Sequence, residues 1–305
     1  MPETIAIDVC IATFKRPFAL RELLESLRNQ DLTGISMRLI VVDNDRQQSA
    51  RAIVDDFRTG SGLQVVYDVE QQQNISLARN RALRHVQADH FAFVDDDETV
   101  CDAWLHRLVD GLHRYQADIV FGPVISILPA DAPAWVQLNF KRARHDSGAK
   151  LQTGGAGNVL LKRTVLAGTQ PYFNPSFGLT GGEDTDFFYR MYLAGRRLIW
   201  CDDAWATEPV APERLTVAWL RRRAFRSGQN FMKIFVRRFP FYKKPIWFAL
   251  KSAQITGALL VLPLVRLTSY PRYVALTARL AAASGQLSYC FFGKDCEEYR
   301  THSIH

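Results

Sequence analysis

The sequence predicts an α/β fold in which helices cover both faces of a mostly parallel β-sheet, followed by a basic helical extension. Three observations predict it: β-rich runs alternate with amphipathic helical stretches, polar residues follow directly after strands, and positive charge gathers near the C-terminus. The 305 residues are 48% hydrophobic and 23% charged, which is ordinary globular composition and enough for a large core. A largely disordered chain is therefore excluded.

The first third of the chain predicts four strands joined by three helices. The strands are expected at residues 5–12, 37–45, 63–69 and 90–94. The helices are expected from Pro17 to Gln30, around residues 49–57, and over 75–86 with Asn74 as the cap. Because strands and helices alternate, the sheet is expected to be parallel, and ligands of such sheets bind at the carboxyl ends of the strands.

The rest of the first 240 residues continues this pattern less regularly. Two more strands are expected at 117–124 and 157–163, and a helix at 183–195 that begins after a glycine pair and ends at Gly195. Residues 129–156 are rich in proline and glycine and predict loops over the site. A further helix is expected from Thr216 to about Arg238.

Polar residues follow three of the four N-terminal strands, at Thr13–Arg16, Asp43–Asp45 and Asp95–Glu98. The carboxyl ends of parallel strands meet at one edge, so one crevice is expected to collect these side chains. The turn after the first strand lacks both G-x-G-x-x-G and G-x-x-x-x-G-K-[ST]. Neither a dinucleotide-binding fold nor a phosphate-binding P-loop is supported.

The four consecutive acids Asp95, Asp96, Asp97 and Glu98 repel one another unless a cation or hydrogen-bond donors neutralise them. Mg²⁺ prefers oxygen ligands and often takes one or two carboxylates together with substrate phosphates. The run therefore indicates a metal site for a nucleotide diphosphate. The alternative is an exposed turn whose acids cap the next helix.

Two further groups are candidates for a site. Arg79 and Asn80, near the start of the third helix, suit an anion or a base edge, although a solvated arginine is the alternative. Glu183 and Asp184 begin a helix after glycines, where a carboxylate is suited to take a proton from an attacking hydroxyl. A helix-capping role is the alternative for this pair.

Five segments resemble, in this order and at these spacings, the family 2 glycosyltransferases with the GT-A fold. They are Val9–Pro17, Val41–Asp45, Ser76–Asn80, Phe93–Glu98 and Gly182–Asp184, and the likeness covers about residues 5–235. It implies a GT-A domain over 1–235, with a nucleotide-binding half at about 1–98 and an acceptor half at about 99–235. Residues 236–305 are expected to form a basic amphipathic helical tail.

The resemblance also implies roles for individual residues. The nucleotide-binding residues would be Thr13, Arg16, Asp43, Arg79, Asp95 and Asp96. Asp97, with Asp95, would ligate Mg²⁺ or Mn²⁺. Asp184 would be the catalytic base of a single displacement that inverts the anomeric carbon, and Glu183 would orient that base or the acceptor.

The chain departs from the family's commoner pattern in two places. Many members complete the metal site with a histidine, but residues 205–210 contain none, which leaves a third protein ligand open. Processive synthases carry a Gln-x-x-Arg-Trp run, which residues 219–226 lack, so one sugar per encounter is expected. Arg223 and Arg226 lie in this segment and are candidates for contact with the diphosphate.

The charge is distributed unevenly. Residues 1–213 carry 22 Lys and Arg against 28 Asp and Glu, whereas residues 214–305 carry 16 against 3. The apolar run from Ala253 to Val265 is short for a membrane span and is flanked by basic residues, which predicts a segment lying at an anionic membrane surface. A second amphipathic stretch is expected at 273–292, and two ordinary core helices are the alternative.

The composition also bears on compartment. The five cysteines show no paired spacing, which argues against disulfides and a zinc site, and the first residues do not form a signal peptide. The expectation is a cytoplasmic protein associated peripherally with the inner membrane. Nucleic acid is excluded as a partner because the aromatic residues of the tail accompany long aliphatic runs.

The expected function is transfer of a sugar, from a UDP-sugar by analogy, to a saccharide or lipid-linked saccharide in bacterial exopolysaccharide or cell-surface polysaccharide synthesis. Two alternatives remain. A sugar nucleotidyltransferase would share the sheet and the metal site but should open with a glycine-rich loop, which this chain lacks. A non-catalytic saccharide-binding module is the other.

Overall fold

A computed structural model describes residues 4–293 and 295–297. The chain forms two compact units, which are described separately. The first unit comprises residues 1–125, 142–179 and 183–209, and the second comprises 126–141, 180–182 and 210–305. The predicted boundary at residue 236 differs from this division, because the helix that begins at Val217 packs with the C-terminal helices.

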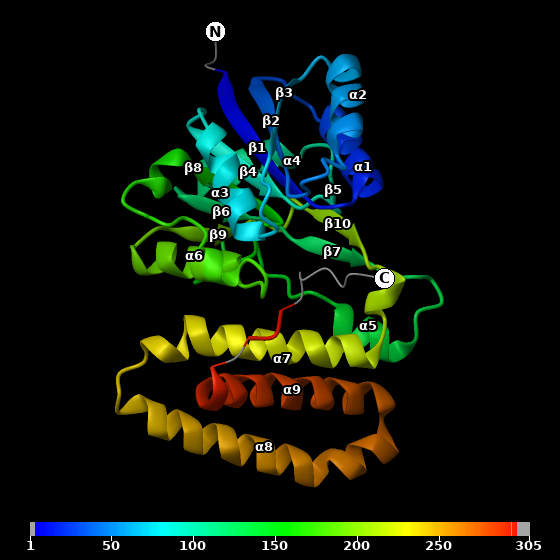
Figure 1. The fold of residues 1–305 in the computed structure, drawn as a ribbon, viewed down its shortest axis with the longest axis vertical. Coiled ribbons are helices and arrows are strands. Elements are labelled where there is room, and N and C mark those ends of the chain that lie inside the picture. The colour runs from blue at the N-terminus through cyan, green and yellow to red at the C-terminus, as the bar shows by residue number, and fades with distance from the viewer. Residues whose placement is uncertain (1–3, 294, 298–305) are drawn as a thin grey trace. The chain divides into compact units, whose positions relative to one another are not determined.

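The first unit is built on a seven-stranded sheet with the order β3-β2-β1-β4-β8-β6-β9 (Figure 1). Strand β8 runs antiparallel to β4 and β6, and the other neighbouring pairs are parallel. The mostly parallel sheet is therefore confirmed. The strands are β1 (Ile5–Thr13), β2 (Ile35–Asp43), β3 (Gln64–Val69), β4 (His90–Val94), β6 (Ile119–Phe121), β8 (Asn158–Lys162) and β9 (Leu198–Trp200).

Helices cover both faces of this sheet, as expected from the alternation of strands and helices. Successive side chains of a strand point to opposite faces, so Val9 and Ile11 belong to one core and Cys10 to the other. The first core contains buried residues of α1 (Pro17–Arg28), α2 (Arg51–Ser61) and α4 (Trp104–Arg114). The second contains residues of α3 (Ile75–His85) and α6 (Glu183–Leu193).

The strand predicted at 117–124 is wrong in one respect, because it is two strands in two sheets. Gly122 and Pro123 separate β6 from β7 (Val124–Ile127), which joins β5 (Thr99–Val100) and β10 (Ala206–Pro209) in the order β5-β10-β7. A Cβ atom on Gly122 would lie 1.9 Å from the carbonyl oxygen of Ala204, so only glycine fits there. The chain therefore bends out of the large sheet at this point.

Several local signals act as the sequence predicts. The Asn74 side chain accepts a hydrogen bond from the Leu77 N–H at 3.1 Å and caps α3. Gly195, just past α6, has a φ of +80°. The predicted loop region 129–156 contains a short helix as well, α5 (Ala134–Phe140).

The second unit is helical and contains α5, α7 (Val217–Ile234), α8 (Lys243–Thr268) and α9 (Tyr270–Phe292). Helix α9 packs against the other three. A Cβ atom on Gly228 of α7 would lie 1.9 Å from the Ala282 carbonyl oxygen, and one on Gly285 of α9 would lie 1.9 Å from that of Phe225. The two glycines therefore allow α7 and α9 to pack backbone against backbone. Short 3₁₀ helices are η1 (Arg163–Leu166), η2 (Pro175–Phe177), η3 (Pro212–Arg214) and η4 (Val236–Arg238).

Helix α8 is longer than the apolar run from which it was predicted. Its 26 residues make it, among the described residues, the one helix long and apolar enough to cross a membrane by length and composition. All five cysteines are free, as expected.

Candidate active site

The acidic run follows β4, and its second carboxylate is turned inward. Asp96 accepts hydrogen bonds from the Thr13 hydroxyl at 2.8 Å and from the Arg16 guanidinium at 3.1 Å. Burial raises the pKa of Asp96 to about 6, against the opposing effect of Arg16. Asp96 thus connects the ends of β1 and β4, and the structure brings together three residues predicted for nucleotide binding.

Asp95 and Asp97 are the more exposed carboxylates of the run. The Asp95 side chain is 43% exposed and that of Asp97 20%, whereas Asp96 is 9% exposed. Asp97 accepts a hydrogen bond from Arg16 at 2.6 Å. Of the three aspartates in the run, the two that were predicted as metal ligands are therefore the more accessible to solvent.

Glu98, the last acid of the run, is buried and was not singled out by the sequence. Burial and the nearby Asp95 raise its pKa well above the usual value. A Cβ atom on Gly157 would lie 2.5 Å from Glu98 Oε1 and 3.0 Å from Asp95 Oδ2. Gly157, which was predicted only as part of a loop, thus makes room for these two carboxylates.

Arg79 joins the acidic run to the start of α6. Its guanidinium is buried, donates to Asp95 Oδ1 at 2.8 Å with one nitrogen and pairs with Glu183 Oε1 through the other. Burial lowers the pKa of Arg79, but the charges of Asp95 and Glu183 outweigh burial and raise it above its usual value. Two groups of predicted residues, far apart in the sequence, therefore meet through one side chain.

Glu183 and Asp184 differ in their surroundings. Glu183 is buried, its Oε2 atom has no hydrogen-bond partner among the described residues, and burial together with Asp184 raises its pKa to about 7. Asp184 is half-buried, and its Oδ1 atom accepts from the Thr185 N–H at 2.6 Å. Its Oδ2 atom lies 3.5 Å from where a Cβ on Gly155 would be. Asp184 therefore offers an oxygen that the described hydrogen bonds do not use.

Asp43 is fully buried at the end of β2. Its carboxylate accepts from the N–H groups of Asp45 at 2.9 Å and Ala50 at 2.8 Å, and from the Tyr67 hydroxyl at 2.9 Å. In this arrangement Asp43 stabilises the loop between β2 and α2. Its contact with a nucleotide base stays a prediction.

The two arginines proposed for the diphosphate lie in the second unit. Both are on α7, where the Arg223 guanidinium lies 5.2 Å from the centre of the Trp219 ring. Their contact with a diphosphate stays a prediction.

The fit of a divalent cation can be judged from the charges around the acidic run. The cluster holds six carboxyl groups against two arginines, Arg16 and Arg79. The neighbouring carboxylates help burial to raise the pKa of Asp96, Glu98 and Glu183, so added positive charge would stabilise their ionised forms. The other three carboxyl groups, which lie beside these, are Asp95, Asp97 and Asp184. Oxygen ligands with excess negative charge suit Mg²⁺ or Mn²⁺. Within the described residues, however, no group of three or more His, Cys, Asp or Glu side chains is arranged to hold a metal ion. Two carboxylates with donor phosphates are the arrangement that fits.

Residues 205–210, where a third metal ligand was left open, contain one carboxylate, Glu208. It is buried and forms an ion pair with Arg142. Glu208 is therefore already neutralised within the protein.

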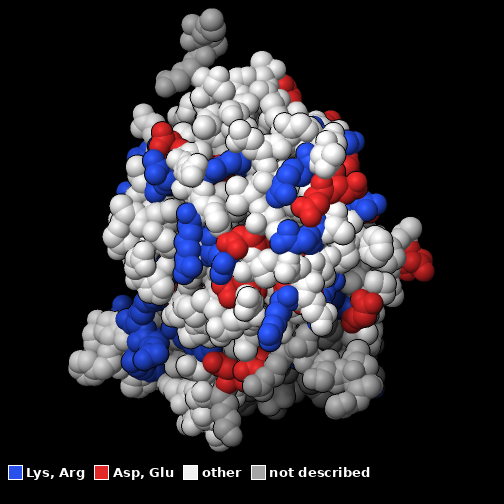
Figure 2. Space-filling view, turned by 45° about the horizontal axis from the view of Figure 1, so that its top comes forward, with Lys and Arg blue, Asp and Glu red and all other residues white. Residues whose placement is uncertain are grey.

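Acidic side chains have basic neighbours elsewhere too. On the face of the molecule that Figure 2 shows, Asp and Glu lie in small groups with Lys or Arg beside them.

Comparison with known proteins identifies the family. The family model described as glycosyl transferase family 2 matches residues 8–168. The chain belongs to glycosyltransferase family 2. The matched residues include both strand ends that Asp96 connects, the whole acidic run and Arg79.

A relative of similar length is the succinoglycan biosynthesis protein ExoM of Rhizobium meliloti. It is 34% identical over 312 residues, which cover 99% of this chain and 98% of ExoM. The similarity to ExoM therefore includes the second unit and not only the sheet.

Two solved structures share the fold. Mannosyltransferase PcManGT from Pyrobaculum calidifontis, in complex with GDP-Man and Mn²⁺, superposes with a TM-score of 0.67 at 19% identity, over 95% of this chain and 88% of that one. TarS 1-349 of S. aureus, in complex with UDP-GlcNAc, gives 0.55 at 18% identity, over 94% and 92%. The predicted GT-A fold is confirmed.

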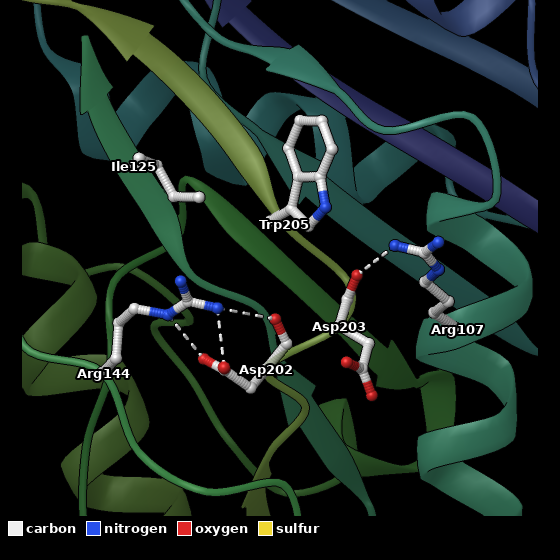
Figure 3. Close-up of a pocket in the computed structure, with 6 residues that line it drawn as sticks. All are labelled: Arg107, Ile125, Arg144, Asp202, Asp203 and Trp205. Atoms are coloured by element: carbon white, nitrogen blue, oxygen red, sulfur yellow. Dashed lines mark hydrogen bonds and ion pairs between the residues drawn. The ribbon is translucent and has the colours of Figure 1, made fainter.

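A separate hollow of about 530 Å³ lies on the α4 side of the first unit (Figure 3). Arg144 pairs there with Asp202 at 2.6 Å, and Arg107 donates to the Asp203 carbonyl oxygen at 2.5 Å. The other lining residues are Ile125 and Trp205. None of the predicted site residues lines this hollow, and α4 belongs to the core opposite to α3 and α6, so it is not part of the candidate active site.

Proposed function

We propose that this family 2 glycosyltransferase moves a sugar from a nucleotide-diphosphate sugar to a hydroxyl group of a saccharide, with inversion at the anomeric carbon. The observation that carries the proposal is the link through Arg79, which joins the acidic run after β4 to the Glu183–Asp184 pair. Such a transfer needs acids that bind the donor and a base, and the residues that we propose for these roles are joined by Arg79. The UDP-GlcNAc complex of TarS and the GDP-Man complex of PcManGT support a nucleotide-sugar donor.

The donor would be held at the strand ends. Arg16, whose side chain is 40% exposed, is suited to a nucleoside or phosphate contact, while Thr13 and Asp96 fix its loop. The remaining nucleotide-binding candidates are Asp43, Arg79 and Asp95. A UDP-sugar is the donor we favour, because TarS structures contain UDP and UDP-GlcNAc.

Asp97 and Asp95 would hold Mg²⁺ or Mn²⁺ together with the donor phosphates. When bound, the ion would neutralise the charge that develops on the departing diphosphate. Arg16 contacts Asp97 in this structure, so the guanidinium would have to give up that contact or share the carboxylate. The Mn²⁺ complex of PcManGT supports a divalent ion.

Asp184 would act as the general base. Its Oδ2 atom takes the proton of the acceptor hydroxyl as the hydroxyl oxygen bonds to the anomeric carbon. The bond from that carbon to the diphosphate oxygen breaks in the same step, and the diphosphate leaves with the electron pair. General-base assistance of this kind contributes roughly 10²–10⁴-fold to the rate.

Glu183 and Arg79 would position this base and the donor acids. Because Arg79 holds both Glu183 and Asp95, it fixes the distance between the start of α6 and the acidic run. Arg223 and Arg226 remain candidates for charge stabilisation at the leaving diphosphate.

The acceptor and the place of action follow from the relative and from the tail. ExoM is a succinoglycan biosynthesis protein, so we propose a saccharide or lipid-linked saccharide acceptor in exopolysaccharide synthesis. The basic second unit would hold the cytoplasmic enzyme at the inner membrane, where such acceptors are found. No observation favours the alternatives of a sugar nucleotidyltransferase or a non-catalytic module.

The proposal is tested by the thermal stability of the protein with UDP-, GDP- and dTDP-sugars, with and without Mn²⁺. A nucleotide-sugar should raise the melting temperature, and Mn²⁺ should increase the rise. Asp97→Ala should remove the increase due to Mn²⁺, whereas Asp203→Ala, at the separate hollow, should not. The absence of any metal-dependent shift with every donor would overturn the proposed donor site.

A further inference from the structure

Helix α8 presents an apolar face that no described residue of the second unit covers. Residues spaced alternately by four and three positions lie on one side of a helix. In α8 these are Ile246, Leu250, Ala253, Gly257, Leu260, Leu264 and Leu267. No residue of α8 is buried, and the large members of this row are 59–85% exposed. Exposed leucines in such a row are unusual on a surface that only water touches.

The charged residues of α8 lie outside this row and are all basic. Lys244 and Lys251 are half-buried on the other side of the helix, and Lys251 lies 5.8 Å from the Trp247 ring. The Arg266 guanidinium lies 5.7 Å from the ring of Tyr273 in α9. No acidic residue occurs between Arg214 and Lys294. An apolar row with basic and aromatic flanks is complementary to the acyl chains and headgroups of an anionic leaflet.

The packing of the second unit decides how α8 can meet a membrane. Helix α9 follows α8 after one residue, returns along it and packs on α7 (Figure 1). If α8 crossed the bilayer, α9 and α7 would have to lie at the same depth. Helix α7 carries Arg221, Arg222 and Arg223, all exposed, and charged side chains are costly there. Crossing is therefore incompatible with this packing, whereas lying in the plane is not.

We infer that α8 lies lengthwise in one leaflet of an anionic membrane, with the row from Ile246 to Leu267 among the acyl chains and α9 above it. At 1.5 Å per residue, this row is roughly 32 Å long and parallel to the membrane surface. The inference adds detail to the membrane association in the proposed function. Only the biological purpose of lipid binding depends on that proposed function. Binding to lipid itself requires no nucleotide-sugar.

The first experiment measures flotation of the full-length protein with vesicles of phosphatidylcholine alone and of phosphatidylcholine with phosphatidylglycerol. The wild type should bind the anionic vesicles more tightly. Leu260→Asp/Leu264→Asp should weaken that binding by at least about 100-fold, since each leucine is worth roughly tenfold on transfer to hydrocarbon. Leu193→Asp is the matched control, because this leucine of α6 is 56% exposed in the first unit. It should bind like the wild type.

The second experiment distinguishes lying from crossing. Single cysteines, Ile246→Cys, Ala253→Cys, Leu260→Cys and Leu267→Cys, are labelled with an environment-sensitive dye after Cys290→Ser and Cys296→Ser. A helix in the plane places all four dyes at one shallow depth, as measured with lipid-bound quenchers. A crossing helix places the middle two deepest, and that result would overturn the inference.

Two other outcomes would also overturn it. One is a wild type that stays with the soluble fraction on both vesicles. The other is a wild type that self-associates in solution and becomes monomeric with Leu260→Asp/Leu264→Asp without binding vesicles, which would assign the face to a second copy. The rise in each variant's melting temperature on adding UDP measures its UDP binding and so reports separately on the donor site. Failure of the lipid experiment is thereby distinguished from failure of the proposed function.

Discussion

At the scale of single residues, the site is a set of carboxylates held together by a few arginines. Arg79 is the most constrained of these, since it is buried between Asp95 and Glu183. A buried charge that loses its partner is costly, whereas exposed pairs contribute little. The stability of the first unit and the geometry of its site therefore depend on the same side chain.

We predict that Arg79→Met lowers the free energy of unfolding by about 3–5 kcal/mol, because it leaves two carboxylates without their buried partner. Arg58→Met is the control: Arg58 is exposed and pairs with Asp55 one turn away, so the loss should stay under about 1 kcal/mol. Urea denaturation of both variants measures the difference. Equal losses would contradict the structural role given to Arg79.

The pH dependence of stability should reveal Glu183. The pKa of Glu183 is about 7 in the folded protein, against its usual value of 4.5. Between pH 4.5 and pH 7, therefore, the folded state keeps a proton on this carboxyl group that the unfolded state has released. The stabilisation is complete below pH 4.5 and is lost as the pH rises through 7. The wild type should therefore lose more free energy of unfolding than Glu183→Gln between pH 5 and pH 8. Parallel pH profiles for the two proteins would contradict the raised pKa.

At the scale of elements, glycines allow segments of the chain to approach one another closely. Gly157 lies against Asp95 and Glu98, and Gly228 lies against the backbone of α9. In both places a methyl group meets atoms that the fold holds in position. Substitution by alanine should therefore affect the site in the first case and helix packing in the second.

Gly157→Ala should weaken donor binding more than stability, because the new Cβ would displace the Asp95 and Glu98 carboxylates. We expect about a tenfold loss in affinity for the nucleotide-sugar, a cost of about 1.4 kcal/mol. Gly60→Ala is the control, since nothing lies within 4 Å of its Cβ position. Calorimetric titration with the donor measures both, and unchanged affinity in Gly157→Ala would show that the loop yields freely.

Gly228→Ala should destabilise the second unit by about 1–3 kcal/mol, because α7 and α9 would have to move apart. Gly257→Ala on α8 is the matched control, since its Cβ position is open and alanine favours a helix. Thermal unfolding followed by circular dichroism compares the two. A loss in Gly257→Ala as large as that in Gly228→Ala would argue against the close packing.

At the scale of the whole molecule, the sequence predicted what local signals determine. The strands β1 to β4 and the caps at Asn74 and Gly195 follow from hydrophobic period and residue type, and they are confirmed. The sheet β5-β10-β7 was missed because strands of two to four residues have no readable period.

Contacts between residues far apart in the chain could not be predicted from the sequence either. The partners Arg79 and Glu183 are 104 positions apart, and both were selected as site residues without any sign that they pair. The second unit takes residues 126–141 from the middle of the chain, which the predicted boundary at 236 did not anticipate. Burial of Asp43 and the role of Gly157 likewise depend on neighbours that only the folded chain brings near.

The central claim is that Asp184 takes the proton of the acceptor hydroxyl, and Asp184→Asn tests it most directly. Donor affinity and sugar transfer to a saccharide acceptor should be measured in parallel for the wild type, Asp184→Asn and the exposed control Asp203→Asn. The account predicts that Asp184→Asn binds the donor like the wild type but transfers the sugar roughly 10²–10⁴-fold more slowly. Asp203→Asn should match the wild type in both donor affinity and transfer rate. Near-normal transfer by Asp184→Asn would contradict it.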